Sequence, residues 1–289
     1  MVVKDAQLSL TTLKSWKAAY VFLVDALKQT QSELPHWLWR YEYPTDIDKY
    51  EKELIRTIQF VLTNFSSKCN RQKSMINLSN SERTFWVDRV VPLFQIFGDQ
   101  TGLLNYQWCE VFSRKHAENT MNIKNCTSGK ARFVDGMGDD VYNEERVVME
   151  SSSGAIKENI RHTVDDTVKQ VHSTIAILNS DIRHHMNAIS HTMTKTSAFG
   201  IHLVRTTMTL SATRLNNDCK SYSHEQIQSC EIPTSYEQRT KWLRTFDLMA
   251  KLMELLRNQK AVSDLLEVEQ DGAVKIGEND TIRAMLQRE

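Results

Sequence analysis

The 289-residue sequence lacks the features that mark several large protein classes. Its 36 Lys and Arg residues balance its 36 Asp and Glu residues, so no overall positive field draws the chain to nucleic acid or to an anionic membrane. The five cysteines are far apart, without a Cys-x-x-Cys pair or the histidine spacing of a zinc site, which predicts reduced thiols. Binding to nucleic acid would therefore need a local basic patch.

Other absences narrow the class of protein further. The longest apolar run, 18–24, is too short to span a bilayer, and the first residues lack the basic, apolar and small-residue regions of a secretory signal. We therefore expect an intracellular protein, in the nucleus or cytoplasm, without a membrane partner. No Walker loop, Rossmann glycine pattern or Gly-x-Ser-x-Gly elbow is present, so nucleotide hydrolysis and serine-hydrolase chemistry are unsupported.

The first part of the chain predicts helices. Apolar residues recur at three- and four-residue steps over 8–31 and again over 46–65, which is typical of helices that pack on a core. Between them lies a stretch rich in Trp and Tyr, bounded by Pro35 and Pro44. This stretch predicts an ordered connection packed on the core rather than a flexible linker.

A third helix is predicted by the capping box that Ser79 forms with Glu82. Pro92 should kink or shorten this helix, because proline removes one backbone hydrogen bond. We expect a fourth helix over about 103–116. The polar segment 117–130 then predicts a loop that leads into the first strand.

Two short strand patterns between 131 and 154 carry one acidic residue each. Asp135 ends the first pattern, and Glu150 ends the second. Side chains alternate along a strand, so Glu150 shares one face with Val148 and Ser152. Two carboxylates on paired strands repel each other unless a cation lies between them, and Mg²⁺ favours a mixture of carboxylates and water. The pattern predicts metal-assisted hydrolysis.

The same residues also fit a simple turn between strands. Asp135-Gly136 is a good turn dipeptide, with Gly138-Asp139-Asp140 close behind it, because Gly and Asp adopt turn conformations readily. On this interpretation each acid is only a solvated residue near a turn. The sequence by itself leaves both interpretations open.

The second half of the chain predicts a helix, two strands and a longer helix. Apolar residues at three- and four-residue steps predict a helix laid against a sheet. They are Val164, Val168, Val171, Ile175, Leu178 and Ile182. Alternating patterns over 198–204 and 207–215 predict adjacent strands, and 221–232 fits an edge strand. A long helix is expected over 235–267, and the polar tail after Gln270 is expected to fray.

This order of elements, with Asp135 on one strand and a Glu-x-Ser motif on the next, resembles the core of the PD-(D/E)XK nuclease superfamily. That superfamily has the restriction-endonuclease-like fold, and the resemblance covers roughly 79–215. It implies that Asp135 and Glu150 bind Mg²⁺ or Mn²⁺, and that the backbone carbonyl of Ser151 is a further ligand. It also matches Glu82 with an acid found on the helix before the sheet.

The sequence departs from this pattern at Ser152, which occupies the position of the family's catalytic lysine. A neutral hydroxyl cannot stabilise developing negative charge as an ammonium does. Some branches of the superfamily supply the lysine from the following helix, where Lys157 and Lys169 are the candidates. Lys169 is the better placed, because His162, Asp166 and Lys169 fall on one helical face. That face lies opposite the apolar stripe, so an ordinary exposed charged surface is the alternative.

The chain is also similar to a group of uncharacterised fungal proteins, a resemblance that brings no assigned activity. Its motifs are ERTFWVDRVVPLF, DGMG, ERVVMESSSG and the segment that begins with EIPTS. Taken together, the sequence predicts an α/β fold with a restriction-endonuclease-like core and a long C-terminal helix. Residues 1–78 form a helical extension packed on the core, and residues 79–289 form the nuclease-like domain.

The implied function is Mg²⁺-dependent hydrolysis of nucleic acid, with DNA favoured over RNA. Basic residues for substrate binding are Arg114, Lys115, Lys124, Lys130 and Arg132 before the first strand, with Arg205 and Arg214 near the later strands. One alternative is a catalytically inactive nuclease fold that binds nucleic acid or protein. Another is a largely helical interaction protein whose Leu- and Met-rich C-terminal helix docks a partner. The sequence leaves the oligomeric state open.

Overall fold

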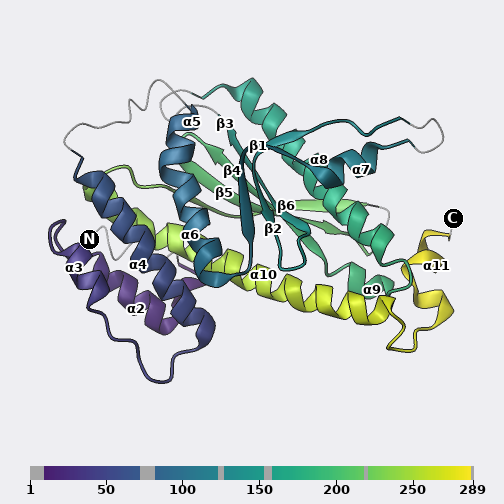
Figure 1. Cartoon of the computed structure of the whole chain (residues 1–289), viewed down its shortest axis with the longest axis horizontal. Helices are drawn as coiled ribbons and strands as arrows, with labels where there is room; N and C mark the ends of the chain where they lie inside the picture. Colours follow the sequence, from purple (N-terminus) through teal and green to yellow (C-terminus); the bar gives the residue numbers. More distant parts are fainter. Residues whose placement is uncertain (1–9, 72–81, 123–126, 153–157, 218–220, 288–289) are drawn as a thin grey trace.

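A six-stranded mixed sheet forms the centre of the computed structural model, which describes residues 10–71, 82–122, 127–152, 158–217 and 221–287 (Figure 1). The strands are β1 (Asn105–Phe112), β2 (Phe133–Asp139), β3 (Glu145–Ser152), β4 (Ser197–Val204), β5 (Thr207–Leu215) and β6 (Tyr222–Glu231). They lie in sequence order across the sheet. The β3–β4 pair is parallel, and the other neighbouring pairs are antiparallel.

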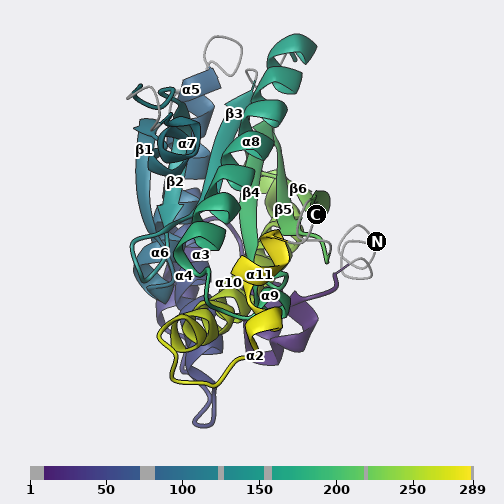
Figure 2. The ribbon, with the colours of Figure 1, turned by 90° about the vertical axis from the view of Figure 1, so that its right-hand side faces the viewer.

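Helices cover both faces of this sheet (Figures 1 and 2). One face carries α7 (Arg114–Thr120) and α8 (Ile160–His184). The opposite helical layer contains η1 (Leu13–Ser15), α2 (Lys17–Ala26), α3 (Leu34–Trp39), α4 (Lys49–Cys69), α5 (Glu82–Phe85), η2 (Trp86–Val90), α6 (Val91–Thr101) and α10 (Trp242–Gln270). The remaining short helices are α9 (Ser190–Met193), η3 (Tyr236–Lys241), η4 (Glu278–Asp280) and α11 (Ile282–Leu286). The fold is therefore mixed α/β, with a long C-terminal helix as predicted.

Helix α8 is the crossover that the parallel pair β3–β4 requires, since parallel strands cannot be joined by a tight turn. Gln170 fastens this helix to the sheet by donating from Nε2 to the carbonyl oxygens of Val148 (3.1 Å) and Ile201 (2.9 Å). Helix α8 can approach the sheet closely here because Gly200, on the strand below Gln170, has no side chain. A Cβ atom at Gly200 would come within 2.6 Å of the Gln170 Oε1 atom. The N-terminal half of α8 is thereby fixed over the ends of β3 and β4.

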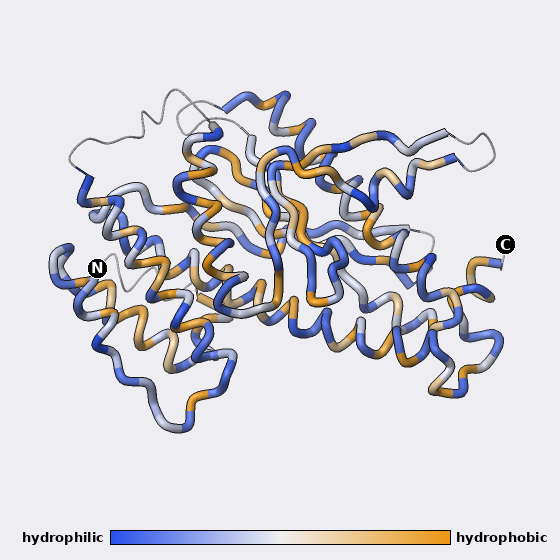
Figure 3. The backbone as a smooth tube through the Cα atoms, viewed as in Figure 1, coloured by the Kyte–Doolittle hydropathy of each residue, from blue (hydrophilic) through white to orange (hydrophobic). Residues whose placement is uncertain are grey.

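One continuous apolar core joins the sheet to the N-terminal helices and α10. In Figure 3, hydrophobic (orange) segments mark the centre of the sheet, and orange and blue alternate along the helices that cover it. Trp242, Phe246, Met249, Met253 and Leu256 of α10 are buried, as the helical pattern predicted. The Asp247 carboxylate on α10 also anchors the start of the chain, because its Oδ1 accepts from the backbone N–H groups of Thr12 (2.9 Å) and Leu13 (2.6 Å). The predicted helical extension thus packs directly on the α/β core.

The predicted helix over 103–116 is wrong, because most of this segment forms β1. Gly102 ends α6 in the left-handed conformation (φ 62°), and the aromatic residues after it favour a strand. Tyr106 and Trp108 stack with ring centroids 5.1 Å apart. They lie over glycines of β2, and a Cβ atom at Gly136 would be 2.9 Å from the Trp108 ring. Packing on a glycine-lined strand therefore outweighs the apparent helical spacing.

The interpretation of Asp135-Gly136 as a turn is also wrong, and so is the prediction that Asp135 ends its strand. Strand β2 continues through Asp139. The turn lies beyond it, where the backbone N–H of Asp140 donates to the carbonyl of Glu144 (2.8 Å) and Asn143 has a positive φ of 61°. Asp135 is therefore near the start of β2.

The apolar stripe predicted for α8 holds only in the second half of the helix. Leu178 and Ile182 are buried, whereas Val164 and Val168 are 55% and 49% exposed. In the first half the residues that face the sheet are polar: Asp166, Gln170, Ser173 and Thr174 are buried. Specific hydrogen bonds to the sheet therefore override the hydrophobic pattern there.

Smaller differences concern the connections and the tail. The aromatic connection between Pro35 and Pro44 contains a short helix, α3. Helix α7 (114–120) includes the end of the expected helix and the start of the expected loop. The interruption expected at Pro92 is present as a π-helical turn, η2, just before it. The tail after Gln270 is not frayed throughout, because Ile282 is buried and its N–H donates to the carbonyl of Ala188 (2.9 Å).

Candidate functional site

Asp135 and Glu150 lie opposite each other on the hairpin of β2 and β3. The strands are antiparallel, and Gly136 pairs with Met149. Asp135, the residue before Gly136, therefore lies opposite Glu150, the residue after Met149. The backbone N–H of Ser151 donates to Asp135 Oδ2 at 2.8 Å, which fixes the Asp135 carboxylate at this position. The pairing depends on the corrected position of the turn. Had Asp135 ended β2, the two acids would lie at opposite ends of the hairpin.

The Glu150 side chain is buried under α8, at 1% exposure. Its Oε2 accepts from the Lys169 ammonium at 2.9 Å, while its Oε1 is buried without a hydrogen-bond partner among the described residues. Burial raises the pKa of Glu150 to about 8, the charges of Asp135 and Asp166 add to this, and Lys169 opposes it. A buried carboxylate with one unpaired oxygen is costly, so this position favours either a proton or a cation.

Lys169 and Asp166 both approach these acids from α8. The Lys169 side chain is 30% exposed, so its ammonium reaches Glu150 and also borders solvent. An ammonium has three donors, of which one goes to Glu150. Arg132 fixes the helix at this point by donating from Nη1 to the Lys169 carbonyl (3.1 Å), and its charge favours ionisation of Glu150. Lys169 is therefore an ion-paired residue at the site rather than part of an open charged surface.

Ser152 lies in an environment that excludes a lysine side chain. It is fully buried, and its Oγ donates to Asp166 Oδ2 (2.6 Å) and lies 2.7 Å from His202 Nε2. His162 approaches the same Asp166 oxygen with Nδ1 at 3.3 Å. Burial lowers the pKa of His202, and the Asp166 charge opposes this effect. Ser152 thus connects β3, β4 and α8 through one shared hydroxyl.

Ser152→Ala should lower the free energy of unfolding by about 1–3 kcal/mol, because Asp166 and His202 would lose their bridging hydroxyl inside the protein. Chemical denaturation monitored by circular dichroism measures this difference. Ser151→Ala is a matched control, since Ser151 is the adjacent buried serine and its Oγ has no hydrogen-bond partner among the described residues. We expect it to be neutral or slightly stabilising. Equal destabilisation by both substitutions would show that the Ser152 network contributes nothing specific.

Two other candidate residues, Glu82 and Lys157, are described in part or not at all. Glu82 begins α5, a helix that contacts β3, but its side chain lies outside the described residues. Its neighbour Arg83 is close enough to lower the pKa of Asp135, although burial raises that pKa more strongly. Lys157 lies outside the described residues altogether. The carbonyl role of Ser151 remains a prediction.

Much of the predicted basic patch is neutralised by carboxylates. Arg114 pairs with Asp139 at 3.2 Å, and the buried Lys115 pairs with Glu144. Arg214 pairs in the same way with Glu225 on the neighbouring strand β6, at 2.7 Å. Lys124 lies outside the described residues, while Lys130 and Arg205 are exposed. Arg132 is the predicted basic residue that the structure brings to Glu150.

His202 is the site residue that the sequence reasoning missed. It pairs in register with Glu150 on the neighbouring parallel strand, so the two side chains lie on the same face under α8. Strand alternation could have revealed it, because His202 follows Ala198 and Gly200 on the face of β4 opposite the apolar residues. A polar histidine on the same face of β4 as Ala198 and Gly200 was the sequence feature that could have identified His202 as a neighbour of Glu150.

The unpaired Glu150 Oε1 and the opposing Asp135 carboxylate fit a hard divalent cation. No three His, Cys, Asp or Glu side chains of the described residues form a metal-binding group. Further ligands would therefore come from backbone, water or substrate, a donor set that Mg²⁺ commonly uses.

Comparisons with known proteins leave the site to be judged by its geometry alone. No family model, curated protein or solved structure matches the chain. Within the residues that the structure describes, every helix is too short or too polar to cross a bilayer.

Proposed function

We propose that the chain is a metal-dependent phosphodiesterase of the restriction-endonuclease-like fold that hydrolyses nucleic acid, preferentially DNA. The observation that carries this proposal is the convergence of Asp135, Glu150 and Lys169, where Glu150 Oε1 has no hydrogen-bond partner among the described residues. The order of the elements supports it. A helix, a strand with Asp135, a strand with Glu150, a crossover helix and two further strands follow one another along the chain.

Asp135 and Glu150 would hold the divalent ion, with Mg²⁺ or Mn²⁺ as the candidates. Such an ion supplies a Lewis acid and a bound water of lowered pKa. Asp135 is oriented for this role by the Ser151 N–H, and Glu150 by Lys169. Helix α8 covers Glu150 from one side, which keeps bulk water away from its carboxylate. Asp135 and Glu150 therefore provide two oriented anionic ligands at a position that is partly shielded from solvent.

Lys169 would take the role that the family assigns to the lysine two residues after the motif Glu. Its partly exposed ammonium has donors left over from its ion pair with Glu150, and these can bind the attacking water or a phosphoryl oxygen. Fixed positive charge where negative charge develops lowers the barrier of phosphoryl transfer. The buried position of Ser152 explains why the ammonium has to come from α8.

The alternative function is a nuclease fold that binds nucleic acid or protein without cutting it. The observation that favours it is the raised pKa of Glu150, to about 8, because a protonated Glu150 is a poor metal ligand at neutral pH. A metal with strong affinity for the Asp135–Glu150 pair would displace that proton, whereas an inactive protein would keep it.

A cleavage assay on linear and supercoiled DNA distinguishes the two functions. Wild-type protein with Mg²⁺ or Mn²⁺ should nick DNA, and Asp135→Asn should lower the rate by at least about 10³-fold, because the position loses an anionic ligand. Asp139→Asn is the matched control, since Asp139 is also a partly buried acid of β2 but pairs with Arg114. It should leave cleavage intact. Equal cleavage by Asp135→Asn and wild type would mean that a contaminant cuts the DNA.

A further inference from the structure

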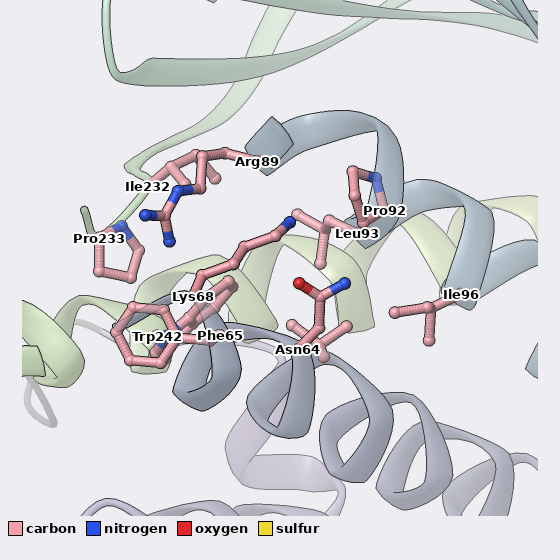
Figure 4. Close-up of a pocket in the computed structure, with 11 residues that line it drawn as sticks. Asn64, Phe65, Lys68, Arg89, Pro92, Leu93, Ile96, Ile232, Pro233 and Trp242 are labelled. Atoms are coloured by element: carbon pink, nitrogen blue, oxygen red, sulfur yellow. The ribbon is translucent and has the colours of Figure 1, made fainter. Parts of the chain in front are cut away.

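A pocket lies in the helical layer on the face of the sheet opposite Glu150 (Figure 4). It is formed by α4, η2, α6, the start of α10 and the segment after β6. It contains about 290 Å³ of empty space, a volume that includes its open mouth. Most of its lining is apolar: Val61, Phe65, Pro92, Leu93, Ile96, Ile232, Pro233 and Trp242. The polar lining residues are Asn64, Lys68 and Arg89. Figure 4 shows these three polar groups pointing into the space between the helices.

Positive charge exceeds negative charge at this pocket. Lys68, Arg71 and Arg89 all share one carboxylate, Asp88. The nearest Asp88 oxygens are 3.9, 3.0 and 3.1 Å from Lys68 Nζ, Arg71 Nη2 and Arg89 Nε, respectively. Among the residues that the structure describes, the salt bridges of Lys68, Arg71 and Arg89 all go to Asp88. The sequence 72–81 between the two helices contains no acid either.

Several donors at the pocket are also unused. The Arg89 side chain is only 8% exposed, and its Nη1 has no hydrogen-bond partner by distance and angle within the described residues, although the Cys69 thiol lies close enough to the guanidinium to interact with it. The indole Nε1 of Trp242 is likewise buried and unpaired there. Lys68 donates to the backbone carbonyl of Asp88, and Arg89 Nη2 reaches the carbonyl of Thr234 at 3.4 Å. Buried cations with free donors are costly unless an anion accepts from them.

We propose that this pocket binds a small apolar monocarboxylic acid, with the carboxylate between Lys68 and Arg89 and the hydrocarbon part against the apolar wall. A guanidinium with a free Nη1 presents the planar donors that a carboxylate accepts. The apolar majority of the lining gives the ligand's body a place to bury its surface. An inorganic phosphate would pair with the cations but would not cover the apolar lining of the pocket. The pocket is independent of the proposed phosphodiesterase site.

Calorimetric titration of the full chain with benzoate tests the proposal. Wild-type protein should bind benzoate, and at least tenfold more tightly than benzyl alcohol or inorganic phosphate. Arg89→Gln should weaken benzoate binding at least tenfold. Arg71→Gln is the matched control, because Arg71 also pairs with Asp88 but does not line the pocket. It should change the affinity less than twofold.

Two further measurements keep the test independent of folding. Ile96→Trp fills the pocket without removing a charge, so it should also abolish benzoate binding even if Arg89→Gln does not fold. Burial lowers the pKa of Lys68 to about 8, the charges of Arg89 and Arg71 lower it further, and Asp88 opposes them. A bound carboxylate would raise this pKa, so binding at pH 8 should take up protons. No binding of millimolar benzoate by wild type, or equal binding by Ile96→Trp, would overturn the proposal. Tighter binding of phosphate than of benzoate would also overturn it.

Discussion

Glu150→Gln should abolish metal-dependent cleavage and at the same time make the protein more stable at pH 8. The loss of activity, at least about 10³-fold, follows because a neutral amide is a poor ligand for a hard cation. The gain in stability follows because the substitution removes a buried carboxylate. A catalytic substitution that stabilises the fold would separate the role of Glu150 in chemistry from any role in folding.

The sign of the pH effect follows from the raised pKa. Glu150 titrates near its ordinary value of 4.5 in the unfolded chain and near 8 in the folded protein, mainly because it is buried. Its favourable contribution is therefore complete below about pH 4.5 and is lost as the pH rises towards 8. The difference in unfolding free energy between Glu150→Gln and wild type should grow by on the order of 2–4 kcal/mol between pH 5 and pH 8. Urea denaturation of both proteins across this range measures it.

Glu145→Gln is the matched control for this prediction. Glu145 is another buried carboxylate of β3, but it accepts from the Arg114 backbone N–H (2.6 Å) and from Ser113 Oγ (3.1 Å) at the opposite end of the strand. This variant should retain cleavage. Mg²⁺ should stabilise wild type and not Glu150→Gln, since only an ionised Glu150 binds the cation well. A Glu150→Gln protein that cuts DNA at the wild-type rate would contradict the proposed site.

Lys169→Met should lower the single-turnover cleavage rate by about 10²–10⁴-fold while changing DNA affinity less than about threefold. Methionine keeps the length and apolar stem of lysine but removes the ammonium, and Lys169 holds one charge at the site rather than a broad binding surface. Rates at saturating DNA, together with a separate binding titration, distinguish the two effects. Lys169→Arg should restore part of the rate, because it keeps the positive charge.

Arg161→Met provides the control on the same helix. Arg161 is an exposed cation two turns before Lys169, and its loss should alter neither rate nor affinity appreciably. If Lys169→Met cuts DNA normally, the ammonium is only the counter-ion of Glu150. If it loses affinity and rate equally, Lys169 binds the substrate rather than acting in the chemical step.

The sequence predicted which residues share a face better than it predicted the elements that carry those residues. Strand alternation was sufficient to place Glu150 and Ser152 on one face, and helical spacing placed Asp166 beside Lys169. The direction of that helical face was not predictable from the apolar pattern. Gln170 donates to the sheet and Asp166 accepts from Ser152, and these hydrogen bonds leave Val164 exposed.

The position of the turn between β2 and β3 was harder to predict than the direction of the α8 face. Gly and Asp recur from Asp135 to Asp140, so composition supports a turn at several places. The observed register follows from packing, because Tyr106 and Trp108 of β1 require glycines on the strand beside them. The apparent helical spacing over 103–116 predicts a helix for that same aromatic pair. The placement of Asp135 opposite Glu150 therefore depends on long-range packing that local patterns do not report.

Anomalous diffraction from crystals soaked in MnCl₂ tests the central claim most directly. The account predicts a manganese peak bound by both the Asp135 and Glu150 carboxylates in wild-type crystals, and no peak there in Glu150→Gln crystals. Metal–oxygen distances should be about 2.0–2.6 Å, the range for hard divalent cations. A wild-type site without manganese, with Glu150 still paired only to Lys169, would contradict the account.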